Sequence, residues 1–164
     1  FQMMQYSDII FGDQNEWEVA SGVPHIPFEA LDADYEIDKE AYQKYFRKMH
    51  QLFPKCKKMV MAVRNQIASS HHTLSGLLYD AVEDQLYTTR IYDIEPIVDP
   101  MGVGDAFIAA YIHAHQKWGD KNQYCLDFSL SASAIKNTVP GDQNLVTEEE
   151  IINNMTSSGG RIQR

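Results

Sequence analysis

The sequence predicts an α/β domain with a mostly parallel sheet flanked by helices, a Rossmann-type arrangement. Three observations favour this fold class. Short apolar runs alternate along the chain with segments of helical periodicity. One run, at 59–63, is continuously apolar, which is typical of a central parallel strand. Hydrophobic residues make up 44% of the 164 residues, which is enough for one domain with a sizeable core.

The first half of the chain carries two expected strands and two expected helices. The strands are short apolar runs. The longer helix follows from Ala41, Tyr45 and Met49, which recur at helical spacing, and it stops at Pro54. The expected elements are a strand at 9–11, a helix at 15–20, a surface loop at 22–36, a helix at about 38–53 and a strand at 59–63.

The second half adds a strand pair and three helices. A turn at 81–84 separates two strand-like runs, and Thr147 with Glu150 forms a capping box, which marks a helix start. The expected elements are strands at 74–80 and 85–91, a strand end at 96–98, helices at 104–118 and about 124–136, a last helix through 155, and a flexible tail at 157–164.

Composition narrows the class of partner. A formal net charge of −9 argues against nonspecific binding to nucleic acid or to an acidic membrane. Two cysteines, Cys56 and Cys125, provide no disulfide framework, which favours the reducing cytoplasm. No run approaches the roughly 18 apolar residues of a membrane span. Because the chain begins at Phe1 and enters a strand almost at once, we expect it to be a fragment.

The histidines are expected to face solvent rather than to bind metal. His113 and His115 are two residues apart on a helix and therefore point to nearly opposite sides. His71 and His72 are adjacent and are expected to lie in a serine-rich loop.

The most informative segment is the turn between the strand end at 96–98 and the helix at 104–118. Gly102 and Gly104 let an anion approach the backbone, and the helix directs its free N–H groups and positive dipole end to the same place. Asp105 is a carboxylate at a place that should collect negative charge. A first-turn helix acid is one explanation, and a group that accepts a proton from an attacking nucleophile is the other.

This segment resembles the second signature of the PfkB, ribokinase-like family of carbohydrate kinases: an acid, small residues, Gly-Asp and a helix rich in small residues. Further stretches are similar to the 2-keto-3-deoxygluconate kinase branch of that family. The resemblance implies a ribokinase-like fold, of which residues 1–156 would be the C-terminal, nucleotide-side part. It rests on residues 99–110, 10–16, 61–80, 132–146 and 160–164.

The resemblance implies that the chain belongs to an enzyme that transfers phosphate from ATP to a sugar hydroxyl. Asp105 would accept the hydroxyl proton, and the backbone N–H groups of Gly102, Val103 and Gly104 would hold the charge growing on the transferred group. Val103 departs from the family, which usually has Gly or Ala at this position.

The resemblance also implies roles for five more polar residues. Asp13 and Glu16 would act on Mg²⁺ through waters, although Asp13 stands where Asn is usual and both could be helix-cap residues. Asp99 would support the turn or a monovalent cation such as K⁺. Arg64, expected at a strand end, and Asn137, expected near the adenine, would contact the nucleotide, with a surface arginine and a helix-end asparagine as the alternatives.

The expected reaction is phosphorylation of 2-keto-3-deoxygluconate to its 6-phosphate. Two alternatives remain open. One is another PfkB sugar kinase, of fructokinase or ribokinase type, and the other is an inactive nucleotide-binding fragment that lacks the sugar-binding half. Assembly into a homo-oligomer also remains open. A dinucleotide-binding oxidoreductase is excluded on spacing, because the turn lacks a third glycine and Asp105 would repel a pyrophosphate.

Overall fold

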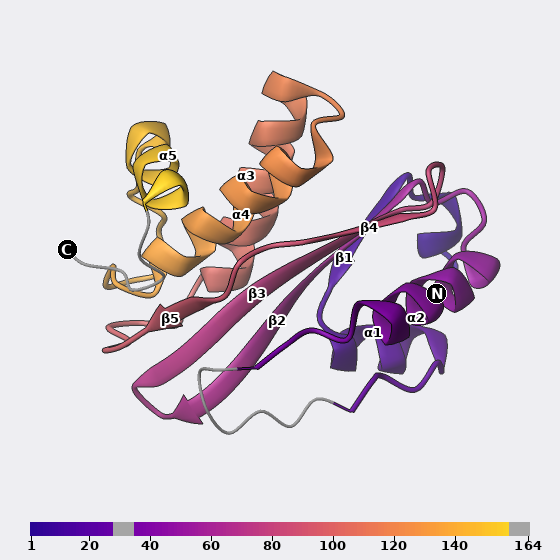
Figure 1. Ribbon diagram of the computed structural model, residues 1–164, viewed down its shortest axis with the longest axis horizontal. Coiled ribbons are helices and arrows are strands. Elements are labelled where there is room, and N and C mark those ends of the chain that lie inside the picture. The colour runs from indigo at the N-terminus through magenta and orange to yellow at the C-terminus, as the bar shows by residue number, and fades with distance from the viewer. Residues whose placement is uncertain (28–34, 158–164) are drawn as a thin grey trace.

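The computed structural model describes residues 1–27 and 35–157 (Figure 1). No helix in this described part is long and apolar enough to cross a membrane. Its elements, in chain order, are the 3-10 turn η1 (Met4–Tyr6), β1 (Ile9–Gly12), α1 (Gln14–Ser21), α2 (Lys39–Leu52), β2 (Lys58–Ala68), β3 (His71–Asp80), β4 (Gln85–Thr88), β5 (Tyr92–Ile94), α3 (Val103–Trp118), α4 (Asn122–Lys136) and α5 (Glu148–Thr156).

The five described strands form one mixed sheet in the order β1-β2-β3-β4, and β5 also pairs with β3. Only β1 and β2 are parallel, whereas β2–β3, β3–β4 and β3–β5 are antiparallel. The expectation of a mostly parallel sheet is therefore wrong. A two-residue turn, Ser69 and Ser70, joins β2 to β3, and so short a connection permits only antiparallel pairing. The apolar run at 59–63 does not indicate strand direction, because burial on both faces also occurs in antiparallel strands that helices cover on both sides.

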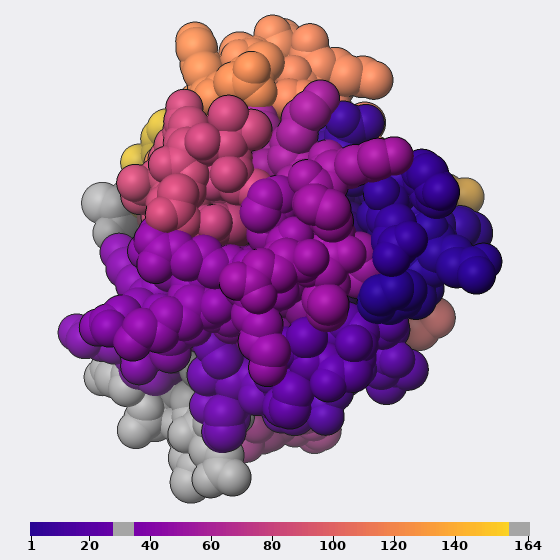
Figure 2. All heavy atoms as spheres, turned by 90° about the vertical axis from the view of Figure 1, so that its right-hand side faces the viewer, coloured from indigo at the N-terminus to yellow at the C-terminus, as the bar shows by residue number. Residues whose placement is uncertain are grey.

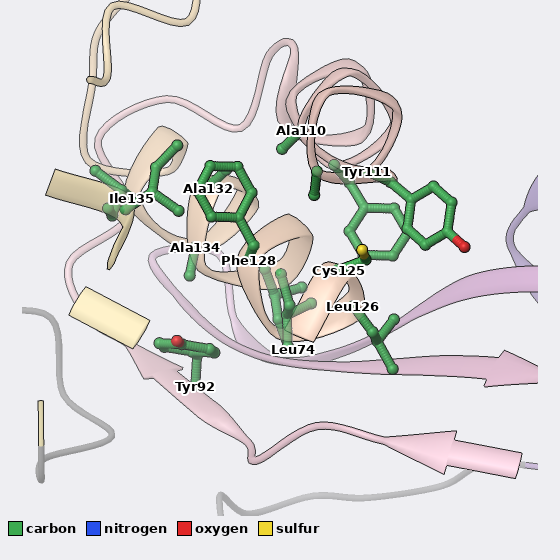
Figure 3. Packing of buried hydrophobic residues seen from close by; sticks show 14 of the residues in the cluster. Leu74, Tyr92, Ala110, Tyr111, Cys125, Leu126, Phe128, Ala132, Ala134 and Ile135 are labelled. Carbon is green, nitrogen blue, oxygen red and sulfur yellow. The ribbon is translucent and has the colours of Figure 1, made fainter. Parts of the chain in front are cut away.

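Helices cover both faces of the sheet (Figure 1). Alternate residues of β2 point to opposite faces: Val60 packs with α3 and α4, and Met59 and Met61 pack with α1 and α2. Figure 3 shows part of the first cluster, in which Tyr111 of α3 and Phe128 of α4 lie among other apolar side chains above the sheet. Because helices cover both faces of the sheet, nearly every residue of β3 is buried, whichever face its side chain points to.

The N-terminal residues lie at the surface of the other face. Figure 2 views this end of the molecule, with the N-terminus in indigo. The rings of Phe1 and Phe53 are 5.3 Å apart, and Lys55 Nζ lies 4.5 Å from the ring of Tyr6. The described parts of the expected loop at 22–36 contain neither helix nor strand; 28–34 lies outside the described residues, as does all of the expected flexible tail except Ser157.

Two further expectations are wrong. The strand before the turn at Gly102 is at 92–94 rather than at 96–98. The N–H of Ile97 donates to Ser70 O and that of Val98 donates to Asn137 O, so residues 97 and 98 do not pair with one neighbouring strand. His72 is buried within β3 instead of lying in a loop, and this burial lowers the pKa of its imidazole. The adjacent His71 is the first residue of β3 and so also lies outside the loop, and its Nε2 contacts Asp93 across the β3–β5 pair.

Serines of α4 bind the helices on either side of it. Ser129 Oγ donates to Phe107 O at 2.6 Å and Ser133 Oγ donates to Val103 O at 3.1 Å, so α3 and α4 run antiparallel. On the other side, Ser131 Oγ donates to the carbonyl of Ile151 in α5 at 2.8 Å. The end of α4 therefore lies beside the start of α3.

Candidate functional site

The start of α3 has no capping side chain, unlike the starts of α1, α2 and α5; the start of α4, at Lys121, has none either. Asp13, Asp38 and Thr147 accept backbone N–H groups at the starts of α1, α2 and α5. Helix α3 begins instead at Gly102, which has φ of +72° and provides no side-chain cap. The first N–H groups of α3 are thus left without a capping side chain, which is the arrangement that binds anions.

The two glycines of this turn serve different purposes. A Cβ on Gly102 would lie 2.3 Å from the carbonyl oxygen of Asp142, and the left-handed backbone of Gly102 also disfavours other residues. A Cβ on Gly104 would meet no heavy atom within 4 Å among the described residues. Folding therefore requires glycine at 102, whereas glycine at 104 leaves open space in front of the helix start.

Asp105 lies in the first turn of α3 and is exposed. Within residues 1–27 and 35–157, no hydrogen bond or ion pair occupies its carboxylate. It stands next to the uncapped N–H groups rather than capping them. A free carboxylate beside free N–H donors can accept a proton from a group that attacks a bound anion.

Asp99 joins the two loops behind the turn. Its Oδ1 accepts the N–H of Met101 at 2.9 Å, and its Oδ2 accepts the N–H of Gly141 at 2.8 Å. These backbone hydrogen bonds hold the pKa of Asp99 below its usual value of 3.8, and the charge of Lys136 adds to the lowering. The structure thus places Asp99 as a support of the turn.

Asp13 and Glu16 form a capping box at the start of α1. Glu16 N donates to Asp13 Oδ1 and Asp13 N donates to Glu16 Oε2, each at 2.9 Å. No hydrogen bond or ion pair connects either residue with Asp105 in the described part of the chain. The same part holds no group of three or more His, Cys, Asp or Glu that could bind a metal directly.

The remaining two expected site residues occupy unlike places. Arg64 does not end its strand, since β2 continues to Ala68; its side chain is exposed, and its charge adds to the lowering of the His72 pKa by burial. Asn137 is the buried C-cap of α4, and its Nδ2 donates to Ser133 O at 2.9 Å. Asn137 thus lies at a helix end, and its contact with a nucleotide stays a prediction.

A cavity of about 230 Å³ lies beside α3, one turn beyond Asp105. Its walls are mostly apolar and come from three helices and the loop before α5. Because an α-helix rises about 1.5 Å per residue, the cavity begins about 6 Å along the helix from Asp105. The residues that give it its character are Ala109, Ala110, Phe128, Val146 and Ile151.

One carboxylate ties α3 to α5 at the edge of this cavity. Glu148 Oε1 accepts from Lys117 Nζ at 2.6 Å, and Glu148 Oε2 lies 2.8 Å from His113 Nε2. The hydrogen bond from Lys117 holds the pKa of Glu148 below its usual range, and the hydrogen bond with His113 lowers this pKa further. The expectation that His113 faces solvent agrees with its exposure, but the sequence pattern did not indicate this contact.

Sequence reasoning also missed Lys136 and the cavity. Lys136 is fully buried at the end of α4. The sequence did contain a signal for it. Lys136 is a charged residue that directly follows the uncharged run of small and apolar residues at 128–135. The cavity had no comparable signal, because it forms between helices that are distant in the sequence.

Comparison with known proteins gives matches in structure only. No protein-family model matches the chain, and no curated protein matches its sequence. The structure matches 2-dehydro-3-deoxygluconokinase from Thermotoga maritima with a TM-score of 0.80 and 26% identity, over 95% of this chain and 43% of that one.

Two other solved structures agree with this match. A PfkB family carbohydrate kinase from Listeria grayi gives a TM-score of 0.75 and 25% identity, over 95% of this chain and 43% of that one. Ribokinase from Arabidopsis thaliana, in complex with ribose and ATP, gives 0.63 and 18%, over 96% and 43%, and shows the fold alone. The chain spans less than half the length of each of these proteins.

Proposed function

We propose that this chain forms the nucleotide side of an ATP-dependent carbohydrate kinase. By its fold the chain belongs to the PfkB, ribokinase-like kinases. Residues 1–156 would be the C-terminal part of that kinase domain. The substrate we propose is 2-keto-3-deoxygluconate, phosphorylated on its 6-hydroxyl, and the similarity to a 2-dehydro-3-deoxygluconokinase supports this choice. The enzyme would act in the cytoplasm, which agrees with the two free cysteines, Cys56 and Cys125.

The observation that carries the proposal is the uncapped start of α3 with a free carboxylate beside it. Phosphoryl transfer needs positioned donors for the charge on the transferred group and an acceptor for the hydroxyl proton. The N–H groups of Gly102, Val103 and Gly104 would supply the donors, and the open space at Gly104 would admit the phosphoryl group. Asp105 would take the proton from the attacking sugar hydroxyl.

The cavity beside Ala109 would hold the adenine ring of ATP. Its distance along α3 suits a nucleotide whose phosphates lie at the helix start and whose base lies about one turn or more farther on. Apolar side chains in its lining, among them Phe128, Val146 and Ile151, favour an aromatic ring over a charged group. Arg64 and Asn137 remain weaker candidates for nucleotide contacts.

Asp13 and Glu16 fit a magnesium ion held through waters. The capping box uses one oxygen of each carboxylate. No hydrogen bond among the described residues takes up Asp13 Oδ2 or Glu16 Oε1, and both residues are exposed, so these oxygens could accept bound water. When bound, Mg²⁺ would neutralise charge on the phosphates of ATP.

The test compares Asp105→Asn with the wild type in the protein expressed from its complete reading frame. We expect turnover with MgATP and 2-keto-3-deoxygluconate to fall about 10²- to 10⁴-fold, the usual contribution of a general base. The Kd for MgATP, measured by calorimetry, should stay within about twofold because Asp105 does not bind the base. Unchanged turnover would contradict the role of Asp105.

A panel of acceptors tests the substrate. Fructose and ribose serve as the alternatives from the same family, and a higher kcat/KM for either would overturn the choice of a sugar acid. The isolated chain is expected to bind MgATP with little transfer, since it spans less than half of the related kinases. Binding without transfer by the complete protein would instead favour a nucleotide-binding module.

A further inference from the structure

The family resemblance implies a monovalent cation at Asp99, and the residues present do not fit one. Both oxygens of this carboxylate already accept backbone N–H groups, from Met101 and from Gly141. Each oxygen keeps a second lone pair, but a cation there would be repelled by the charge of Lys136, which already acts on this carboxylate. The negative charge at this place is therefore balanced from within the protein.

Lys136 supplies a positive charge at this place. Its side chain is fully buried, and its Nζ donates to the carbonyl oxygen of Val139 at 3.2 Å. Its charge also reaches Asp99. Burying a lysine costs several kcal/mol unless acceptors and opposite charges compensate for the lost hydration. A lysine in this position is consequently expected to balance negative groups around it.

Those negative groups lie directly behind the anion-binding turn. Helix α4 ends at Lys136, so the negative end of its dipole lies here, next to the start of α3, and the carbonyl of Asn137 accepts the N–H groups of Val98 and Asp99. The carboxylate of Asp99 adds a full negative charge. Without a cation, both would weaken the attraction of the α3 start for phosphate.

We propose that the ammonium group of Lys136 takes the place of a free monovalent cation, so that the anion site of this protein works without K⁺. The proposal concerns the same site as the proposed kinase function and rests on it for the nucleotide measurements. It makes Lys136 a positioning residue that acts on the phosphates through the turn at 99–104 and does not touch them.

The first experiment varies the cation with the wild-type protein. MgATP affinity and thermal unfolding are measured in KCl, NaCl and tetramethylammonium chloride at equal ionic strength. We expect less than a twofold change in Kd and superimposable melting curves. MgATP binding that is several-fold tighter in K⁺ than in tetramethylammonium would overturn the proposal.

The second experiment uses two matched variants that both remove the charge. Lys136→Met keeps the space filled, whereas Lys136→Ala opens a space that an ion can enter. We expect both to weaken MgATP binding about tenfold in tetramethylammonium chloride, as the loss of one nearby charge predicts. K⁺ or NH₄⁺ should restore binding in Lys136→Ala and leave Lys136→Met unchanged.

A purely structural lysine would give a different result. In that case K⁺ would restore neither variant, and Lys136→Met, whose side chain is similar in shape, would bind MgATP like the wild type. Either result would overturn the proposal. Circular dichroism spectra like that of the wild type establish that the variants are folded before binding is measured.

An arm without nucleotide separates this proposal from the kinase proposal. The melting midpoint of Lys136→Ala should rise with K⁺ concentration, since an ion that binds only the folded state stabilises it. Thallium NMR should detect a bound ion in Lys136→Ala and none in the wild type. If these ion effects appear and MgATP does not bind, the nucleotide proposal fails and the lysine proposal stands; if the ion effects are absent, the lysine proposal fails.

Discussion

Three glycine-to-alanine substitutions separate what folding requires of the turn from what ligand binding requires. Gly22 and Gly102 have nearly the same positive φ, +73° and +72°, but differ in their surroundings. A Cβ at Gly22 would meet nothing within 4 Å among the described residues, whereas a Cβ at Gly102 would lie 2.3 Å from Asp142 O. Gly104 has neither the positive φ nor a close neighbour.

These differences set the expected magnitudes. Gly22→Ala should cost about 1–2 kcal/mol, the penalty of a left-handed alanine. Gly102→Ala adds overpacking, because the Asp142 carbonyl must move by about 1 Å to reach ordinary contact, and such crowding costs about 1–3 kcal/mol. We expect a total of about 2–5 kcal/mol. Gly104→Ala should be neutral or slightly stabilising, since alanine is the better helix former.

Urea unfolding and MgATP titration of the same three variants provide the measurements. Gly104→Ala should keep or gain stability and yet lose about tenfold in MgATP affinity, because its methyl group enters the space in front of the helix start. Gly22→Ala serves as the control, with lower stability and unchanged affinity. Equal stability of Gly22→Ala and Gly102→Ala would refute the role of the Asp142 contact, and wild-type affinity of Gly104→Ala would refute the anion site.

Three more predictions concern stability and reactivity. Asp99 has a folded-state pKa below its usual 3.8, so its contribution is present above about pH 4 and is lost as the pH falls through the folded-state value. The difference in urea midpoint between the wild type and Asp99→Asn should therefore shrink from pH 7 to pH 3, and a constant difference would contradict this. Burial raises the pKa of the Cys56 thiol to about 11, so its reaction with Ellman's reagent at pH 7 should be slow in buffer and fast in urea; rapid labelling of the native protein would show that the thiol is accessible. Asp38→Ala should cost about 1 kcal/mol, because Asp38 Oδ1 accepts the N–H of Ala41 at the start of α2; a midpoint equal to that of the wild type would deny this cap any contribution.

Local signals in the sequence predicted local structure well. The capping box at Thr147 and the helix at 104–118 depend on neighbouring residues only, and both are present in the structure with small shifts of the helix bounds. The fold class followed from the alternation of apolar runs with helical segments and from the family signature. Solved kinase structures confirm the ribokinase-like α/β fold, although the sheet of the described chain is not mostly parallel. The predicted catalytic and binding roles stay predictions, although the structure does leave Asp105 free beside an uncapped helix.

Strand direction and non-local contacts could not be predicted. An apolar run reports how deeply a strand is buried and not which way its neighbour runs, so 59–63 gave no warning of the antiparallel pairing of β2 with β3. The pairing of Gly102 with Asp142 joins residues 40 positions apart, and no local pattern specifies it. Lys136 was visible in the sequence, but its burial depends on how the folded chain covers the end of α4, which no local pattern specifies.

The serines of α4 connect the two ends of the proposed nucleotide site through hydrogen bonds. Ser129 and Ser133 are bonded to α3, which carries the turn, and Ser131 is bonded to α5, which forms one wall of the cavity. Each of these hydrogen bonds links a neighbouring helix to the same buried helix. A substitution that displaces α4 would therefore act on the turn and on the cavity wall at once.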